Sequence, residues 1–262
     1  MNNLQNIDVK DNKYRYINPA QLILALDVAD FNQAKTMIET VKNEVEFFKI
    51  GLELMMSGDY FKVIELLKKY DKKIFADLKI YDIANTVASA VKNLAKLSLD
   101  LLTIHSASKD IMLRANEYKG EMKIIAVTIL TNLDQQDIIS MGFDKNLTIN
   151  DLVLKKAALT LECGLDGVVS SALEAKMLRQ NFGNKFLIIT PAILPNIDNY
   201  NQNNQSNDHN FINDDQKRVA NIAEAINNGS SHLVIGRPIT KNDNPALIAN
   251  ICQNQITKCY FS

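Results

Sequence analysis

The sequence contains no segment suited to export or to crossing a membrane. Residues 1–18 are polar and lack the apolar core of a signal peptide. Apolar runs elsewhere end at strand length, well short of the ~20 residues that span a bilayer. The three cysteines, Cys163, Cys252 and Cys259, form no CxxC pair and leave one odd, which favours a reducing compartment over a disulfide framework. We therefore expect a cytoplasmic protein without a membrane partner.

The sequence also lacks an excess of charge of either sign. It has 29 basic and 30 acidic residues, a net charge of −1, so no overall attraction draws it to nucleic acid. The motifs GxGxxG, GxSxG and GxxxxGK followed by Ser or Thr are absent, which argues against the sites that those motifs build. His105, His209 and His232 are solitary and predict no metal site.

Eight apolar segments of strand length are present, and amphipathic segments with helical spacing separate them. The eight segments are 22–28, 46–52, 73–80, 99–107, 123–130, 166–171, 186–194 and 232–239. Apolar strands that alternate with helices are typical of a parallel sheet covered by helices. Eight such units in 262 residues predict an α/β protein with a (β/α)8 fold, the TIM barrel. A doubly wound open sheet is the alternative, because periodicity cannot establish closure.

One domain, residues 19–262, is expected after the polar extension 1–18, because no shift in composition marks a second one. A segment rich in Asn and Gln interrupts it at 196–210, where nine of fifteen residues are of these two types. A polar surface insertion would have this composition. The segment follows the seventh predicted strand, however, and loops at that position of a TIM barrel frequently bind phosphate.

Charged residues stand toward the carboxyl ends of the first three predicted strands, where TIM barrels carry their active sites. Asp77 and Lys79 are two residues apart, so a regular strand would point both side chains the same way. Lys49 and Asp27 on neighbouring strands can complete an alternating array, in which the carboxylates keep the lysines protonated. A salt-bridge network that only fills the barrel is the alternative, since an unpaired buried charge costs several kcal/mol.

Polar residues also stand at or just beyond the carboxyl ends of the later predicted strands, namely His105, Thr128, Thr131, Ser170, Ser171, Gly236 and Arg237. The pair Gly236 and Arg237 suits a phosphate, because glycine lets a ligand approach the backbone and arginine offers a planar set of donors.

Asp82 precedes a helical segment and has two interpretations. It is either a helix N-cap or a functional carboxylate.

The segment FADLKIYDIANT, residues 75–86, resembles the DxKxxDIPxT signature of the orotidine 5′-phosphate decarboxylase family, with Ala84 at the usual proline. Further segments match that family in order and spacing: LILALDV, FFKIGLELM, TIHSA, AVTILT, CGLDGVVSSALEA, DDQKRV and VIGRPIT. The resemblance implies a TIM barrel that acts as a homodimer with shared active sites. It implies conversion of orotidine 5′-phosphate to UMP and CO2 in pyrimidine biosynthesis, without metal or cofactor.

The resemblance also implies roles for individual residues. Lys79 would protonate C6 of the pyrimidine, and Asp77 would lie beside the substrate carboxylate. Lys49 and Asp27 would complete the array and bind ribose hydroxyls. The remaining positions would contact substrate: Asp82, Ile83 and Thr86 in the partner's site, Thr131 at the pyrimidine, and Gln216, Gly236 and Arg237 on the phosphate side.

Two positions depart from the family pattern. In TPAILP, residues 190–195, Ala192 stands where the family often has glycine and Leu194 where it often has arginine.

Two other functions remain open. Sister barrels that act on sugar phosphates also carry an Asp-x-Lys strand but use Mg²⁺, and a non-catalytic phosphate-binding protein would keep the pocket without turnover.

Overall fold

The computed structural model describes residues 16, 18–197 and 218–261. Eight parallel strands form a closed barrel in the order β1-β10-β7-β6-β5-β4-β3-β2, so the TIM-barrel prediction is confirmed and the open-sheet alternative is wrong. The barrel strands are β1 (Gln21–Ala25), β2 (Phe47–Gly51), β3 (Lys73–Ile80), β4 (Leu101–His105), β5 (Lys123–Val127), β6 (Gly167–Val169), β7 (Leu187–Thr190) and β10 (His232–Ile235).

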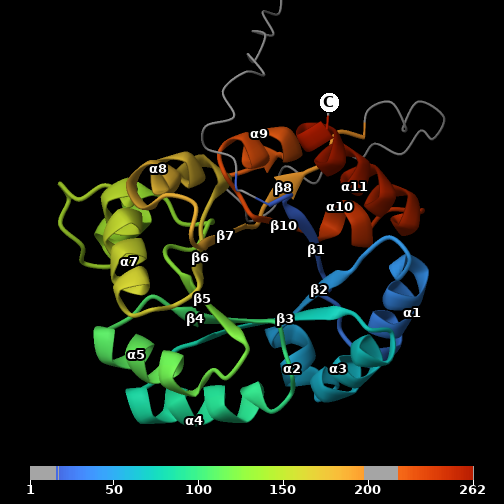
Figure 1. Ribbon diagram of the computed structural model, residues 1–262, viewed down its shortest axis with the longest axis horizontal. Helices are drawn as coiled ribbons and strands as arrows, with labels where there is room; N and C mark the ends of the chain where they lie inside the picture. The colour runs from blue at the N-terminus through green and yellow to red at the C-terminus, as the bar shows by residue number, and fades with distance from the viewer. Residues whose placement is uncertain (1–15, 17, 198–217, 262) are drawn as a thin grey trace, which may run out of the picture.

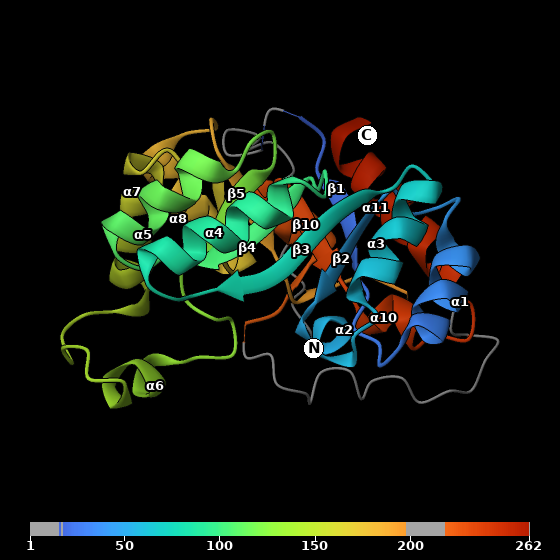
Figure 2. The same cartoon turned by 90° about the horizontal axis from the view of Figure 1, so that it is seen from below.

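Helices surround the strands, as the view down the barrel shows (Figure 1). From the side, the helices flank the strands and α6 projects away from them (Figure 2). The helices are α1 (Phe31–Val41), α2 (Leu52–Ser57), α3 (Tyr60–Lys69), α4 (Ala84–Ala95), α5 (Lys109–Tyr118), α6 (Gln135–Ser140), α7 (Ile149–Glu162), α8 (Ala172–Phe182), α9 (Ile222–Asn227), α10 (Arg237–Thr240) and α11 (Pro245–Phe261). None of the helices in the described part of the chain is long and apolar enough to span a bilayer.

Apolar side chains fill the space on both faces of the strands. Phe47 and Phe75 belong to a buried cluster drawn from seven of the eight barrel strands, with the partly buried Val169 of β6 packed against it. Their neighbours Phe48 and Ile74 belong to a larger cluster that includes the buried faces of the helices. This two-sided burial explains why the strands read as nearly continuous apolar runs.

The seventh predicted strand ends earlier than its sequence indicates. The structure ends β7 at Thr190, and Ala192 has a φ of 60°. A φ in this left-handed region interrupts the extended backbone of a strand. The chain instead forms β8 (Ile193–Leu194), which pairs with β9 (Ala220–Asn221) in a small separate sheet that was not predicted.

Most of the two predicted polar segments lies outside the described residues. This applies to residues 1–15 and 17 of the extension and to residues 198–210 of the Asn- and Gln-rich segment. Gln216, predicted on the phosphate side, and His209 also lie outside the described residues.

Candidate active site

A cavity of about 720 Å³ opens at the carboxyl ends of the barrel strands. A (β/α)8 enzyme carries its active site at this end. The lining combines charged residues of β2, of β3 and of the segment that follows β1 with polar and apolar residues that follow β5, β7 and β10. Residues with polar groups or backbone at the wall include Asp27, Lys49, Asp77, Lys79, Thr131, Asn132, Gly236, Arg237 and Lys241.

Four charged side chains form a continuous array on one wall of the cavity. Lys49 Nζ lies 2.9 Å from Asp27 Oδ1 and 3.3 Å from Asp77 Oδ2. Lys79 Nζ lies 2.8 Å from the same Asp77 oxygen. Asp77 thus stands between two ammonium groups. The alternating array predicted from the sequence is present.

Burial and charge act in opposite directions on the two central members of the array. Burial alone would lower the pKa of Lys49, but Asp77 and Asp27 outweigh it and raise that pKa above its usual value. Burial alone would raise the pKa of Asp77, but Lys49 and Lys79 outweigh it and lower that pKa. Both groups therefore stay ionised at neutral pH.

The array is supported by a residue that the sequence had not singled out. Thr103 Oγ1, on β4, donates a hydrogen bond of 2.9 Å to Asp77 Oδ1 and accepts one of 2.9 Å from the Lys79 backbone N–H. One hydroxyl thus orients the Asp77 carboxylate and holds the backbone of Lys79. A threonine near the end of a neighbouring strand was the available signal, within the TIHSA segment.

The β3 backbone is not regular where it presents these charges. Ala76 pairs with Leu102 of β4, and the next pair is Ile80 with Ile104. Between these two pairs β3 advances by four residues and β4 by only two, so the register shifts. Lys79 has a φ of 46°, a conformation that costs a non-glycine residue about 1–3 kcal/mol and tends to occur at functional sites. Simple two-residue alternation was therefore the wrong reason for expecting Asp77 and Lys79 to meet, although they do meet.

The wall formed after β7 and β10, which adjoins β1, carries fewer charges. Arg237 and Lys241 line it beside the apolar side chain of Leu194. A Cβ at Gly236 would lie 3.3 Å from the Ala25 Cβ, so this glycine allows the end of β10 to pack closely against β1. Gly236 is the N-cap of α10 and Arg237 its first residue, so both lie just beyond β10, the strand that they were expected to end.

Three predicted site residues lie away from this cavity. Asp82, Ile83 and Thr86 are exposed and are not among the residues that line it. The N-cap interpretation of Asp82 is wrong: α4 has Ile83 as its N-cap, with no capping hydrogen bond from a side chain. Within the described residues, the Asp82 carboxylate accepts the backbone N–H of Ile83, at 2.6 Å, and the helix begins one residue later than the motif suggested.

The histidines remain without metal-binding partners among the described residues, where no group of three or more His, Cys, Asp or Glu side chains could hold an ion. His105 is half-buried against the edge of Tyr81, and burial together with Lys156 and Lys79 lowers its pKa. Burial lowers the pKa of His232 to about 4, assisted by Lys123 and Lys73.

Comparisons with known proteins agree with this geometry. Residues 20–250 match the family model described as "Orotidine 5'-phosphate decarboxylase / HUMPS family". A protein of Methylococcus capsulatus named orotidine 5′-phosphate decarboxylase is 41% identical over 236 residues, which are 90% of this chain and 91% of that relative. One of that name from Xanthomonas euvesicatoria is 35% identical over 237 residues, with the same coverage.

A solved structure shows the same arrangement of the chain. The crystal structure of orotidine 5′-phosphate decarboxylase from Lactobacillus acidophilus has a TM-score of 0.74 and 30% identity. The match covers 93% of this chain and all of that one. Fold, family model and full-length relatives coincide, and the chain belongs to the orotidine 5′-phosphate decarboxylase / HUMPS family.

Proposed function

We propose that this protein converts orotidine 5′-phosphate to UMP and CO2 in pyrimidine biosynthesis. The observation that carries the proposal is the Asp27–Lys49–Asp77–Lys79 array at the mouth of the barrel. It occurs in a chain whose full-length relatives are named for this reaction. The proposed reaction requires neither a metal nor a cofactor. The cytoplasmic location stays a prediction from the sequence.

In the proposed reaction the bond between C6 and the carboxylate carbon breaks, and its electron pair remains on C6. CO2 leaves, and a proton from Lys79 Nζ bonds to C6 to give UMP. A fixed cation at C6 stabilises the negative charge as it develops, which is the form of catalysis that a preorganised site performs best. Asp77 lies beside the departing carboxylate and keeps the Lys79 ammonium oriented at 2.8 Å.

The rest of the cavity would bind the nucleotide. Thr131 contacts the pyrimidine, and Lys49 and Asp27 bind ribose hydroxyls. Arg237 binds the phosphate, and Lys241, which lines the same wall, adds a second cation where Leu194 has replaced the family's arginine. Gly236 and Gln216 belong to the same phosphate side. Binding the distant phosphate supplies energy that aligns the pyrimidine with Lys79.

We also propose a homodimer with shared sites. Tyr81, Asp82, Ile83 and Thr86 form an exposed segment at the start of α4, and the exposed fractions of Tyr81 and Ile83 are 69% and 71%. A second copy of the chain would cover these side chains and receive Asp82, Ile83 and Thr86 in its own cavity. In an isologous dimer each such contact occurs twice.

Mixed dimers test the shared site. Lys79→Ala and Asp82→Ala subunits, each nearly inactive alone, should regain activity when they exchange, because one site of each heterodimer then carries both changes and the other neither. Recovery should reach at most about half of the wild-type activity per heterodimer. If exchange is demonstrated and activity stays absent, Asp82 acts within its own chain or not at all.

The activity itself is tested by following the absorbance of orotidine 5′-phosphate with purified protein in excess EDTA. We expect full turnover to UMP, unchanged by added Mg²⁺. Activity that disappears in EDTA and returns with Mg²⁺ would favour the sister barrels. Phosphate binding without turnover would favour the non-catalytic alternative.

A further inference from the structure

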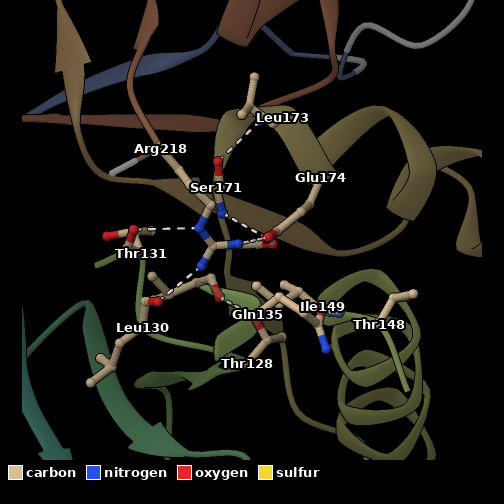
Figure 3. A network of polar contacts seen from close by, with 12 residues as sticks. Thr128, Leu130, Thr131, Gln135, Thr148, Ile149, Ser171, Leu173, Glu174 and Arg218 are labelled. Carbon is tan, nitrogen blue, oxygen red and sulfur yellow. Dashed lines mark hydrogen bonds and ion pairs between the residues drawn. The ribbon is translucent and has the colours of Figure 1, made fainter. Parts of the chain in front are cut away.

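The guanidinium group of Arg218 joins its own segment, just before β9, to helix α8 and to the loop after β5. Arg218 forms an ion pair with Glu174, in the first turn of α8. Its Nη2 donates a hydrogen bond of 2.9 Å to the Leu130 carbonyl, and its Nε donates one of 3.4 Å to the Thr131 carbonyl. Figure 3 shows the guanidinium between these groups.

Glu174 is itself held firmly in place. Its side chain is 4% exposed. One carboxylate oxygen accepts the Ser171 backbone N–H at 3.0 Å and the Ser170 hydroxyl, and the other pairs with Arg218. Ser171 and Glu174 also form the capping box of α8. Thus a buried, fully bonded carboxylate fixes the position of Arg218.

The network continues into the cavity wall. Leu130 and Thr131, whose carbonyls accept from Arg218, both line the cavity, and so does Val219, the residue that follows Arg218. The Arg218 side chain is 13% exposed. Because two successive carbonyls point at one guanidinium, the loop after β5 has little freedom to rotate. The Thr131 side chain is then held at one place on the wall.

We propose that Arg218, anchored by Glu174, is a positioning residue that sets the place of Thr131 against the pyrimidine. The inference rests on the proposed function, because it uses the Thr131 contact assigned there. Arginine suits this task, since its planar group offers donors in several fixed directions at once. A lysine ammonium at the same position could not satisfy Glu174 and both carbonyls with one geometry.

A double-mutant cycle tests the coupling. Thr131→Val should reduce kcat/KM for orotidine 5′-phosphate about 10-fold, mainly through KM, because one polar contact is lost. Arg218→Lys should cause a similar ~10-fold loss in the wild-type background. In the Thr131→Val background it should cause less than about a 3-fold further loss, because there is no longer a hydroxyl to position.

Arg179→Lys is the matched control. Arg179 is as buried as Glu174 and also donates to backbone carbonyls, those of Gly229, Gly183 and Phe186, but it does not line the cavity. Whatever fold-loss in kcat/KM Arg179→Lys causes alone, it should multiply with the fold-loss of Thr131→Val in the double variant. If Arg218→Lys multiplies in the same way, to about 100-fold in the double variant, the positioning role is wrong.

Two further readouts separate the possible failures. In the ligand-free protein, the NMR order parameter of the Thr131 methyl group should fall in Arg218→Lys and stay unchanged in Arg179→Lys. An order parameter that is unchanged in both variants would overturn the inference. Should Arg218→Lys fail to fold, Glu174→Gln is taken through the same cycle with the same expectation. If Thr131→Val alone leaves kcat/KM unchanged, the pyrimidine contact is wrong, and so is the role given to Arg218. Absence of turnover by the wild type refutes the proposed function instead.

Discussion

The two walls of the cavity differ in how completely they are organised without a ligand. On the β1–β3 wall, Lys49 and Asp77 are nearly buried and every member of the charged array has an ionic partner within 3.3 Å. On the β7–β10 wall, Arg237 is half-buried, Lys241 is exposed, and Leu194 contributes an apolar surface. One wall is a preformed electrostatic environment, and the other is an open surface suited to binding.

This difference matches the two demands of the proposed reaction. Charge that develops at C6 is stabilised best by groups that need not reorganise, and the array meets that condition. The phosphate binds at a distance from C6. The groups that bind it need to be organised only when the nucleotide is present. We therefore expect changes in the array to affect the chemical step and changes on the other wall to affect mainly binding.

The largest effect is expected for Lys79→Ala. Loss of both the cation and the proton donor should lower kcat by roughly 10⁴-fold or more, while circular dichroism and thermal unfolding show a folded protein. Folding should survive because Asp77 keeps Lys49 at 3.3 Å. Lys73→Ala, on the exposed opposite end of β3, is the control and should retain activity.

Two other results would change this interpretation. Near wild-type turnover by Lys79→Ala would remove the lysine from the mechanism. Failure of that variant to fold would indicate that the array serves mainly to fill the barrel, which is the structural alternative.

A smaller effect is expected on the β7–β10 wall. Arg237→Ala should reduce kcat/KM for orotidine 5′-phosphate about 100-fold, since a charge-assisted contact contributes about 2–3 kcal/mol. It should leave kcat/KM for the nucleoside orotidine, which has no phosphate, unchanged. Lys241→Gln should show the same pattern with a loss of only a few-fold, because Lys241 is exposed. Equal losses for nucleotide and nucleoside would place the phosphate elsewhere.

The smallest effect concerns the backbone of the binding wall. Ala192 adopts a φ of 60°, where glycine carries no steric penalty. Ala192→Gly should therefore raise the free energy of unfolding by up to about 1 kcal/mol and change kcat little. Ala158→Gly, on an exposed position of α7, should lower it by about 1 kcal/mol. A destabilised Ala192→Gly would show that the alanine methyl group makes a contact that outweighs the backbone strain.

The sequence predicted the barrel because both faces of its strands are covered, so apolar runs and helical spacing alternate along the whole chain. It also predicted the array, because charges inside a barrel must find partners and Asp27, Lys49, Asp77 and Lys79 were the candidates. The local irregularities escaped prediction. The residue type of Lys79 does not indicate a positive φ, and at Ala192 the one signal was that the family often has glycine there. Nor do the residue types indicate that α4 would begin only after Ile83.

Contacts between residues distant in sequence escaped prediction for a different reason. By its residue type Thr103 is an ordinary β-branched strand residue. It meets the Lys79 N–H only because the register of β3 against β4 is shifted. Arg218 is 44 residues from Glu174 in sequence, and no periodicity connects them. Such contacts are made by tertiary packing, and only the three-dimensional structure reveals them.

Hydrogen exchange at C6 of UMP is the most direct test of the central claim, that Lys79 exchanges a proton with C6. If Lys79 gives its proton to the C6 carbanion, the reverse step must let the same amine remove the C6 proton of bound UMP. In D2O, the wild-type protein should replace that hydrogen with deuterium, as followed by ¹H NMR, and Lys79→Ala should not. Exchange that proceeds equally in both proteins would contradict the account.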